Sequence, residues 1–374
     1  MPYIIYFPYN ENKIPQQLTT TNTFIEQAWQ ELTMLRYLKV KHISSPKLIA
    51  PWIDQAETYY LDSIHSNWRS AGLLYYYSFL NLAKALLVAK RRFKYKALDT
   101  SVIHHGLSAS LQDISSLKDY EIQIFPPSMR GNKNVFSNFY EIVTNCKWDY
   151  QNPVTIKLQD ILGYCPDVSV ESKQLFNIGK RIFPIQSLHR EVNQNMWFEM
   201  IVPKAYTNVI QTELSSLNLQ FIESDKLDAF DRNDWLDAFQ LTFHSLKNFT
   251  FVRTQPTQFT QDNRTEIVKA SWKKVSKNLS PYITAPVYLD VSKPTWDFVQ
   301  KADIAGKCIS WHPVLSNYLM SFALATILRY QPQLLKTGTD NCFYAKAWSS
   351  QCSRTTLGYF LMLFTYPPIT LGTR

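Results

Sequence analysis

The stretch WRSAGLLYYYSFLNLAKALL, residues 68–87, decides the fold class of this chain. Nearly every position is Leu, Ala, Tyr or Phe, which is too apolar for a surface helix. The polar positions recur at spacings that form one narrow stripe along a helix: Ser70, Tyr77, Asn81 and Lys84. A helix with so narrow a polar stripe is covered by neighbours on most sides. We therefore expect a central helix, roughly residues 66–91, inside a bundle.

Helical patterns flank this segment on both sides. They occupy residues 21–38, 50–66, 312–332 and 355–368. Pro51 and Pro313 stand where a helix would have its first turn, and Pro332 stands just beyond the end of the third pattern. Helices at both ends of the chain indicate that the C-terminal part packs back on the bundle.

The middle of the chain is more mixed. Residues 217–224, 249–254 and 286–291 resemble strands, whereas His189 is expected on a helix surface. The predicted fold class is therefore α+β, mostly α-helical, with a helical bundle and a mixed α/β middle region. We expect an N-terminal strand and bundle in 1–125, the mixed region in 126–300 and C-terminal helices in 301–374, all in one compact unit.

Composition excludes several kinds of chemistry. The chain has 9 Gly in 374 residues and contains neither G-x-G-x-x-G nor G-x-x-x-x-G-K-[ST], which argues against the standard nucleotide folds. The 5 Cys include no C-x-x-C pair, and no H-E-x-x-H or G-x-S-x-G motif occurs. Aspartates at every third position from Asp225 to Asp237 do not converge on one point of a helix. We expect no metal and no cofactor.

Charge and hydropathy bear on partners and on the compartment. The formal net charge is +9, which permits an anionic partner such as RNA or DNA. No long uncharged apolar segment and no secretion signal are evident, so we expect a soluble cytoplasmic protein that has reduced thiols and does not enter a membrane.

Two basic groups interleave cations with aromatic rings, as suits contact with phosphates and stacking on bases. Their candidate nucleic-acid-binding residues are Lys90, Arg91, Arg92, Lys94 and Lys96 in the first group, and Lys269, Trp272, Lys273 and Lys274 in the second. The first group follows the central helix directly, so a solvated C-terminal end of that helix explains it equally well.

The pair His104-His105 precedes Gly106, a residue that lets the backbone turn sharply. A histidine here could act as a general base or contact a phosphate. It could also be a polar loop residue whose bonds go to the backbone. The other notable histidine, His312, is expected to cap the start of a helix or to lie in the core.

These residues carry a resemblance to known families. The segment WRSAGLLYYYSFLNLAKALL resembles the central helix of HEPN-type domains, through Arg69, the three tyrosines 75–77, Phe79 and residues 83–86. The segments HHGLS, QDISSLKDYEIQIFPPSMRGNKNVFSNFYEIV and HPVLSNYLMSFALATILRYQP are similar to the YaaC-like family of uncharacterised bacterial proteins. The likeness covers roughly residues 60–145 and 312–332.

The HEPN resemblance implies a helical bundle that usually dimerises. Many such domains are metal-independent RNases whose motif is an Arg and a His separated by four to six residues. His105-Gly106 matches the second half of that motif, but Leu98, Asp99 and Thr100 stand where the Arg should be. HEPN-like domains without the motif act in assembly or nucleic-acid binding, often in bacterial defence or stress systems.

Two functions follow as expectations. The first is a non-catalytic binding or assembly protein, a homo-oligomer that engages nucleic acid or a protein partner through the two basic groups. The second is a nuclease in which His105 is the general base or acid, and Arg92 or Arg69 stabilises the phosphate charge.

Overall fold

The structure is a computed structural model, and it describes residues 23–34, 46–90, 103–110, 114–129, 132–227, 246–279, 281–284 and 295–365. Contacts divide the chain into two compact units. Unit 1 comprises residues 1–19, 182–300 and 369–374, and unit 2 comprises residues 20–181 and 301–368. The chain is α+β and mostly helical, as the sequence predicts.

The boundary expected at residue 126 does not coincide with this division, because residues 126–181 pack within unit 2. There β3 (Glu121–Ile124) pairs with β6 (Val154–Lys157), and α5 (Val135–Thr144) packs on α3 (Trp68–Ala89). Strand pairing and helix packing thus hold this segment to the helices, although its sequence reads as a mixed region.

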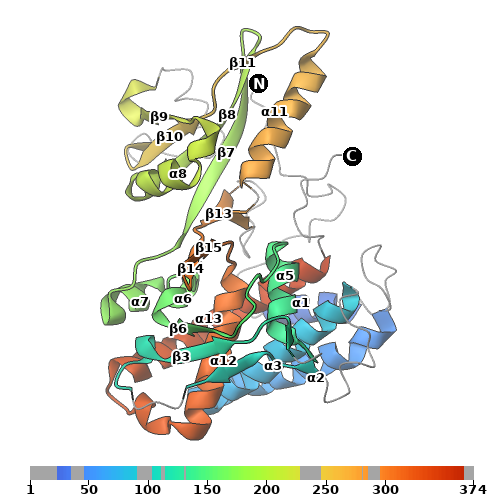
Figure 1. The fold of residues 1–374 in the computed structure, drawn as a ribbon, viewed down its shortest axis with the longest axis vertical. Helices are drawn as coiled ribbons and strands as arrows, with labels where there is room; N and C mark the ends of the chain where they lie inside the picture. Colours follow the sequence, from blue (N-terminus) through green and yellow to red (C-terminus); the bar gives the residue numbers. More distant parts are fainter. Residues whose placement is uncertain are drawn as a thin grey trace. The chain divides into compact units, whose positions relative to one another are not determined.

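Unit 2 is built around α3, which begins after the cap residue Asn67 (Figure 1). Among the described residues its most extensive helix contacts are with α2 (Pro46–His65), α5, α12 (Pro313–Tyr330) and α13 (Asp340–Thr365). The N-terminal helix α1 (Thr23–Met34) packs on α2 and α13. The predicted central helix is confirmed, since fourteen of its residues are buried.

Aromatic rings fill the interior around α3. Tyr75 meets Trp348 of α13 with ring centroids 6.4 Å apart, and Tyr76 meets Phe322 of α12 at 5.4 Å. Such pairs add about 0.5–1.5 kcal/mol each beyond the free energy of the area that they bury.

The polar stripe of α3 is narrower than predicted, because Asn81 is only 6% exposed. By length and composition α3 could cross a membrane. However, 72% of the most apolar 18-residue segment of α3 is buried inside the fold, as in a core helix.

Two helix boundaries differ from expectation. Pro46 opens α2, and Pro51 lies inside that helix. The backbone N–H groups of the first turn have no hydrogen-bond partner within the helix, so a proline there loses none. Pro46, rather than Pro51, therefore occupies the favourable first position. The final helix α13 begins at Asp340, well before the expected residue 355. By contrast, α12 begins at Pro313 and ends two residues before Pro332, as predicted.

Small strands complete unit 2. They are β1 (Ile103–His104), β2 (Leu107–Ala109), β4 (Ser128–Met129), β5 (Asn132–Asn134), β14 (Ala302–Ile304) and β15 (Lys307–Ile309). The short helices are α6 (Gln159–Leu162) and α7 (Ser169–Phe176). Two three-stranded sheets have the orders β1-β5-β4 and β2-β3-β6, while β14 and β15 form a hairpin.

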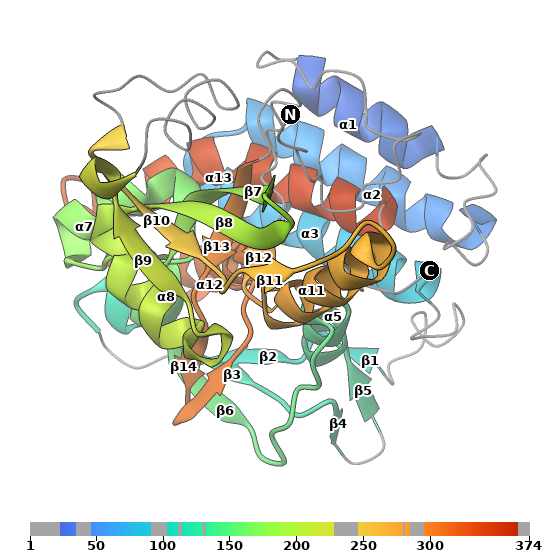
Figure 2. The same cartoon turned by 90° about the horizontal axis from the view of Figure 1, so that it is seen from above.

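Unit 1 is an antiparallel sheet with the strand order β12-β13-β7-β8-β10-β9, and β11 also pairs with β8 (Figure 2). The strands are β7 (Ile182–Val192), β8 (Asn195–Pro203), β9 (Gln220–Glu223), β10 (Phe249–Arg253), β11 (Thr257–Gln258), β12 (Ile283–Thr284) and β13 (Thr295–Val299). The predicted strands near 217–224 and 249–254 are confirmed, while 286–291 lies outside the described residues. His189 lies in β7 rather than in a helix.

Two described helices of unit 1 pack on the same face of its sheet. They are α8 (Thr207–Glu213) and α11 (Arg264–Leu279). Thr207 bonds Thr250 at 2.9 Å, and Arg264 bonds Glu191 at 2.8 Å. The pairing registers place Glu191 and Thr250 on one face, because alternate residues of a strand point to the same side.

Candidate functional site

The His-His-Gly turn is fixed between the two three-stranded sheets of unit 2. His104 ends β1, which pairs in parallel with β5, and Leu107 begins β2, which pairs with β3. Between them the His105 carbonyl accepts the Phe136 N–H at 3.1 Å. The next carbonyl, that of Gly106, accepts the Phe125 N–H at 3.0 Å. These backbone bonds hold His105 in one position.

Gly106 is required at this turn for two reasons. Its φ is +81°, a value that side chains with Cβ disfavour. A Cβ there would lie 2.4 Å from the Asn134 side-chain oxygen. Asn134 cannot move away easily, because it caps α5 by accepting the Ser137 N–H at 2.9 Å and also donates to the Phe125 carbonyl. The turn therefore depends on a glycine packed against a helix cap.

The His105 ring is oriented by the fold. Its Nδ1 accepts the Leu107 N–H at 3.1 Å, and its ring lies 5.6 Å from that of Phe322. An imidazole that accepts at Nδ1 is neutral and carries its proton at Nε2. The residue keeps an exposed edge, yet desolvation by the surrounding protein lowers the pKa of His105, as do His104 and the positive charges of Lys84 and Arg329.

Lys84 of α3 and Arg329 of α12 are the cations that act on His105. The Lys84 ammonium lies over the Trp52 ring, 4.7 Å from its centroid. Arg329 Nε donates to the Ala325 carbonyl at 3.0 Å, and its guanidinium lies 5.7 Å from the Tyr330 ring. Both cations thus lie beside aromatic rings.

Tyrosines border this site. Burial, together with the neighbouring Tyr77, raises the pKa of the Tyr76 hydroxyl above its usual range, and the nearby charge of Arg329 opposes that rise. Tyr76 thus remains protonated at neutral pH. Tyr77 is partly exposed, and its ring packs 5.4 Å from that of Tyr59.

Arg69 bonds to the segment that follows α12. Its guanidinium donates to the Leu335 carbonyl at 3.1 Å and to the Thr337 hydroxyl at 3.3 Å, and it lies 4.5 Å from the Trp68 ring. It links the start of α3 to the segment after α12. The other predicted partner, Arg92, lies outside the described residues.

The first basic group is described only at Lys90, which caps the C-terminal end of α3. Its ammonium is buried, and desolvation lowers the pKa of Lys90. The remaining predicted residues of this group, Arg91, Arg92, Lys94 and Lys96, lie outside the described residues.

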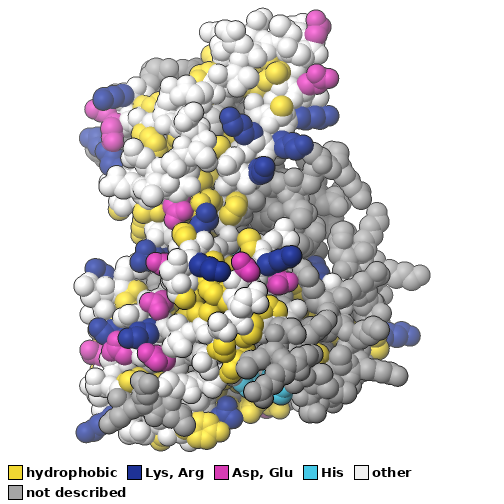
Figure 3. All heavy atoms as spheres, in the orientation of Figure 1, with side chains coloured by type: hydrophobic (Ala, Val, Ile, Leu, Met, Phe, Trp, Pro, Cys, Tyr) yellow, Lys and Arg dark blue, Asp and Glu magenta, His cyan; other side chains and the backbone are white. Residues whose placement is uncertain are grey.

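The second basic group lies on α11. Lys269, Lys273 and Lys274 are exposed, as is Lys277 one turn further on. Lysine and arginine side chains gather over α11 in Figure 3. Arg264 is bound through two bonds to Glu191, at 2.8 and 3.1 Å, and anchors the start of the helix. Trp272 lies on the same helix, but its side chain is outside the description.

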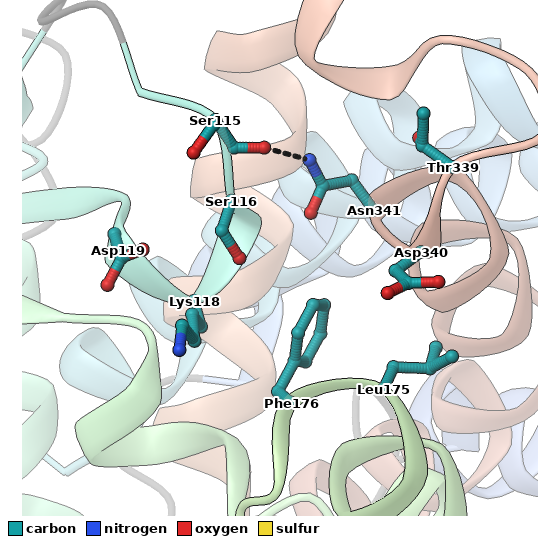
Figure 4. Close-up of a pocket in the computed structure, with 9 residues that line it drawn as sticks. All are labelled: Ser115, Ser116, Lys118, Asp119, Leu175, Phe176, Thr339, Asp340 and Asn341. Atoms are coloured by element: carbon teal, nitrogen blue, oxygen red, sulfur yellow. Dashed lines mark hydrogen bonds between the residues drawn. The ribbon is translucent and has the colours of Figure 1, made fainter.

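A pocket of about 510 Å³ opens at the start of α13 (Figure 4). Asn341 is its best-placed polar group, but its amide is used by the fold. It accepts the Leu117 N–H at 2.8 Å and donates to the Ser115 and Leu334 carbonyls at 2.9 and 3.1 Å. The charged residues of the lining are one cation, Lys118, and two acids, Asp119 and Asp340.

Across the described ranges, no group of three or more His, Cys, Asp or Glu side chains is placed to hold a metal ion.

His312 caps the start of α12, where its side chain accepts the Val314 N–H at 3.1 Å. The predicted cap is thus confirmed.

The model of the YaaC-like protein family matches residues 14–348, which is most of the chain. The chain belongs to the YaaC-like family. This match includes the His-His-Gly turn, α11 and α12. Comparison of this YaaC-like protein with curated proteins and with solved structures gives no match.

Sequence reasoning missed Arg329 as a neighbour of His105 in this YaaC-like chain. Arg329 lies in the last turn of α12, where a cation is ordinarily explained by the helix dipole. Lys84 did carry a signal, as a member of the polar stripe on the central helix, but the stripe alone does not say what it faces.

Proposed function

We propose that this YaaC-like protein is a non-catalytic nucleic-acid-binding protein, and that the lysine face of α11 contacts the phosphate backbone. The lysine face consists of Lys269, Lys273 and Lys277. The observation that carries the proposal is their spacing: three exposed lysines recur every fourth residue, which places them on one side of the helix.

The dimensions of the lysine face suit an extended polyanion. Its three ammonium groups span about 12 Å of helix axis, at about 1.5 Å per residue. Lysines in such a row neutralise phosphates and release counterions, so binding depends steeply on salt. Lys274 lies to one side of the row and extends the positive surface, while the only acidic residue within α11 is Glu266, in its first turn.

The test is binding of single-stranded RNA and duplex DNA by the full chain at several salt concentrations. The variant Lys269→Gln/Lys273→Gln/Lys277→Gln should lower the slope of log affinity against log salt by about 2 on single strands. The control Lys47→Gln/Lys147→Gln/Lys346→Gln removes three exposed lysines of unit 2 and the same charge. An equal loss in both variants would show that only net charge matters and would contradict the proposal.

A nuclease is the second candidate, because a guanidinium does act on His105: that of Arg329. In this candidate function Arg329 takes the role expected of Arg92 or Arg69. The His105 bond to Leu107 weighs against it, since it occupies the ring nitrogen that a general base needs. The test is cleavage of a mixed RNA and DNA pool by the wild type, His105→Ala and Arg329→Ala. Cleavage that both variants lose would favour the nuclease over the binding protein.

In this proposal the helices of unit 2 are a HEPN-like bundle, and the protein is a cytoplasmic homo-oligomer within a bacterial defence or stress system that includes a protein partner. The arrangement of four helices around α3 is consistent with such a bundle. Light scattering of the purified chain tests the homo-oligomer. A monomer at working concentrations would contradict the oligomer and leave the proposal of nucleic-acid binding unaffected.

A further inference from the structure

The pocket at the start of α13 has walls from three segments of unit 2 (Figure 4). Lys118 belongs to the segment 115–119, Phe176 ends α7, and Asp340 begins α13. We propose that this pocket binds a small zwitterion of the amino-acid class. Its carboxylate meets Lys118, its ammonium meets Asp340, and its apolar side chain lies on Phe176. This zwitterion site shares no residue with the lysine face of α11 and is independent of the proposed function.

The first argument is the charge of the pocket. Within the described residues, the side chains of Lys118 and Asp340 form no hydrogen bond and no ion pair. Figure 4 shows these two side chains on opposite sides of the Phe176 ring. Asp119 is also acidic, but it is adjacent to Lys118 on the same wall, so Asp340 is the carboxylate across the pocket. Opposite charges that line one cavity without pairing suit a ligand that carries both charges, because charge-assisted hydrogen bonds are the strong ones.

The second argument is the way in which Asn341 fixes two of the walls. Its buried amide accepts the Leu117 N–H at 2.8 Å and donates to the Ser115 carbonyl at 2.9 Å. These bonds join the segment 115–119 to the first turn of α13. The fold thus holds Lys118 and Asp340 in place with a neutral side chain and leaves both charges available.

Tyr344 fixes the third wall to the same helix. Its ring packs on Phe176 with centroids 5.2 Å apart, and its hydroxyl accepts the Ser172 hydroxyl at 3.2 Å. Both partners lie on α7, which is therefore tied to α13. Walls that are already fixed lose little conformational entropy when a ligand binds.

The size and the apolar side of the pocket narrow the ligand class. Its volume of about 510 Å³ lies in the range of ordinary small-molecule sites, about 300–1,000 Å³. Leu175 and Phe176 supply apolar surface beside the charges. Two acids against one cation disfavour a nucleotide or another polyanion. An amino acid with an apolar side chain combines both charges and the apolar group in one small molecule.

The experiment titrates the full chain with L-phenylalanine, L-leucine and two analogues that each lack one charge. Phenethylamine has no carboxylate, and 3-phenylpropanoate has no ammonium. We expect calorimetry to detect both amino acids and the analogues to bind about tenfold or more weakly, because each loses one charge-assisted hydrogen bond. Glycine keeps both charges but has no side chain to rest on Phe176, so it should also bind more weakly. Chemical-shift titration follows the weaker ligands.

The variants assign each charge to one end of the ligand. Lys118→Gln should weaken phenylalanine about tenfold and leave phenethylamine unchanged, because that ligand has no carboxylate. Asp340→Asn should also weaken phenylalanine about tenfold, but it should leave 3-phenylpropanoate unchanged. The matched controls Lys346→Gln on α13 and Asp62→Asn on α2 remove exposed charges elsewhere in unit 2 and should change nothing.

An analogue that binds as tightly as phenylalanine would overturn the zwitterion site, because one charge would then suffice. The same holds if neither phenylalanine nor leucine binds the folded wild type, or if either pocket variant keeps the wild-type affinity. Melting curves check that each variant folds. If Asp340→Asn, which changes the first turn of α13, does not fold, Lys118→Gln decides the question.

Discussion

His105 accepts the backbone N–H of Leu107 through Nδ1 at 3.1 Å, and this bond determines what the histidine can do. It fixes the neutral tautomer that carries a proton at Nε2. Protonation of the ring would place two hydrogens between the same nitrogen atoms and break the bond. The residue that most resembles a catalytic base in the sequence is thus built as a donor.

The first prediction concerns this tautomer. Because desolvation, His104 and the two cations lower the pKa of His105, its ring should be mostly neutral at pH 6.5, where a free imidazole is about half protonated. Long-range ¹H–¹⁵N correlation, assigned with His105→Gln, should show a proton on Nε2 alone. A spectrum of the imidazolium, or of the Nδ1–H tautomer, would remove the basis for the donor role.

The second prediction concerns Gly106. Gly106→Ala should destabilise the chain by about 2–4 kcal/mol, from the positive φ and from overlap with Asn134. Gly306→Ala is a matched control, since Gly306 has a φ of +74° but open space at its Cβ position. It should cost about 1–2 kcal/mol in urea unfolding. Equal losses of stability in the two variants would mean that the Asn134 side chain moves aside at little cost.

The third prediction concerns the sheet of unit 1. Glu199 is fully buried and binds Arg190, Arg253 and the Trp197 indole N–H. Glu199→Gln should cost about 3–5 kcal/mol, because it leaves buried guanidinium charge without a carboxylate.

Glu191→Gln provides the comparison on the same sheet. Its partner Arg264 is 41% exposed at the side chain, so this change should cost under about 1 kcal/mol. Denaturant titration of both variants gives the difference directly. A small loss for Glu199→Gln would show that water reaches the cluster.

The fourth prediction is a pH dependence that arises at His312. Burial lowers the pKa of His312 to about 3, below its ordinary value of about 6.5. The unfolded chain then binds a proton that the folded chain does not, so stability is lost as pH falls below about 6.5. At pH 4.5 this loss is about 2–3 kcal/mol.

The variant His312→Asn separates the cap from the titration, because Asn also caps helices but does not ionise in this range. It should lower stability at pH 7, since the ring contact with Tyr359 is lost, and it should flatten the stability profile between pH 7 and 4.5. Urea unfolding at both pH values measures this. An unchanged slope would assign the acid sensitivity to other groups.

The fifth prediction concerns Arg69, which links α3 to the segment after α12. Arg69→Gln should lower the free energy of unfolding by about 1–2 kcal/mol through loss of its bonds to Leu335 and Thr337. Urea unfolding of the wild type and the variant measures this difference. A free energy of unfolding equal to that of the wild type would show that these two bonds do not stabilise the fold.

The sequence by itself determined the features that depend on neighbours along the chain. The apolar pattern of residues 68–87 predicted the buried central helix, and His312-Pro313 predicted the start of α12, because helix periodicity and capping act over a few residues. The β7–β8 hairpin escaped prediction. Its turn residues Asn193 and Gln194 both have positive φ, and the usual glycine signal is missing.

Only the tertiary structure decided what surrounds His105. Phe322 of α12 packs against its ring, and no local pattern specifies which residues of distant segments meet. The same holds for Glu199, whose arginines come from two other strands through pairing registers that are set by the whole sheet. Local physics built the elements, and packing between distant segments built the sites.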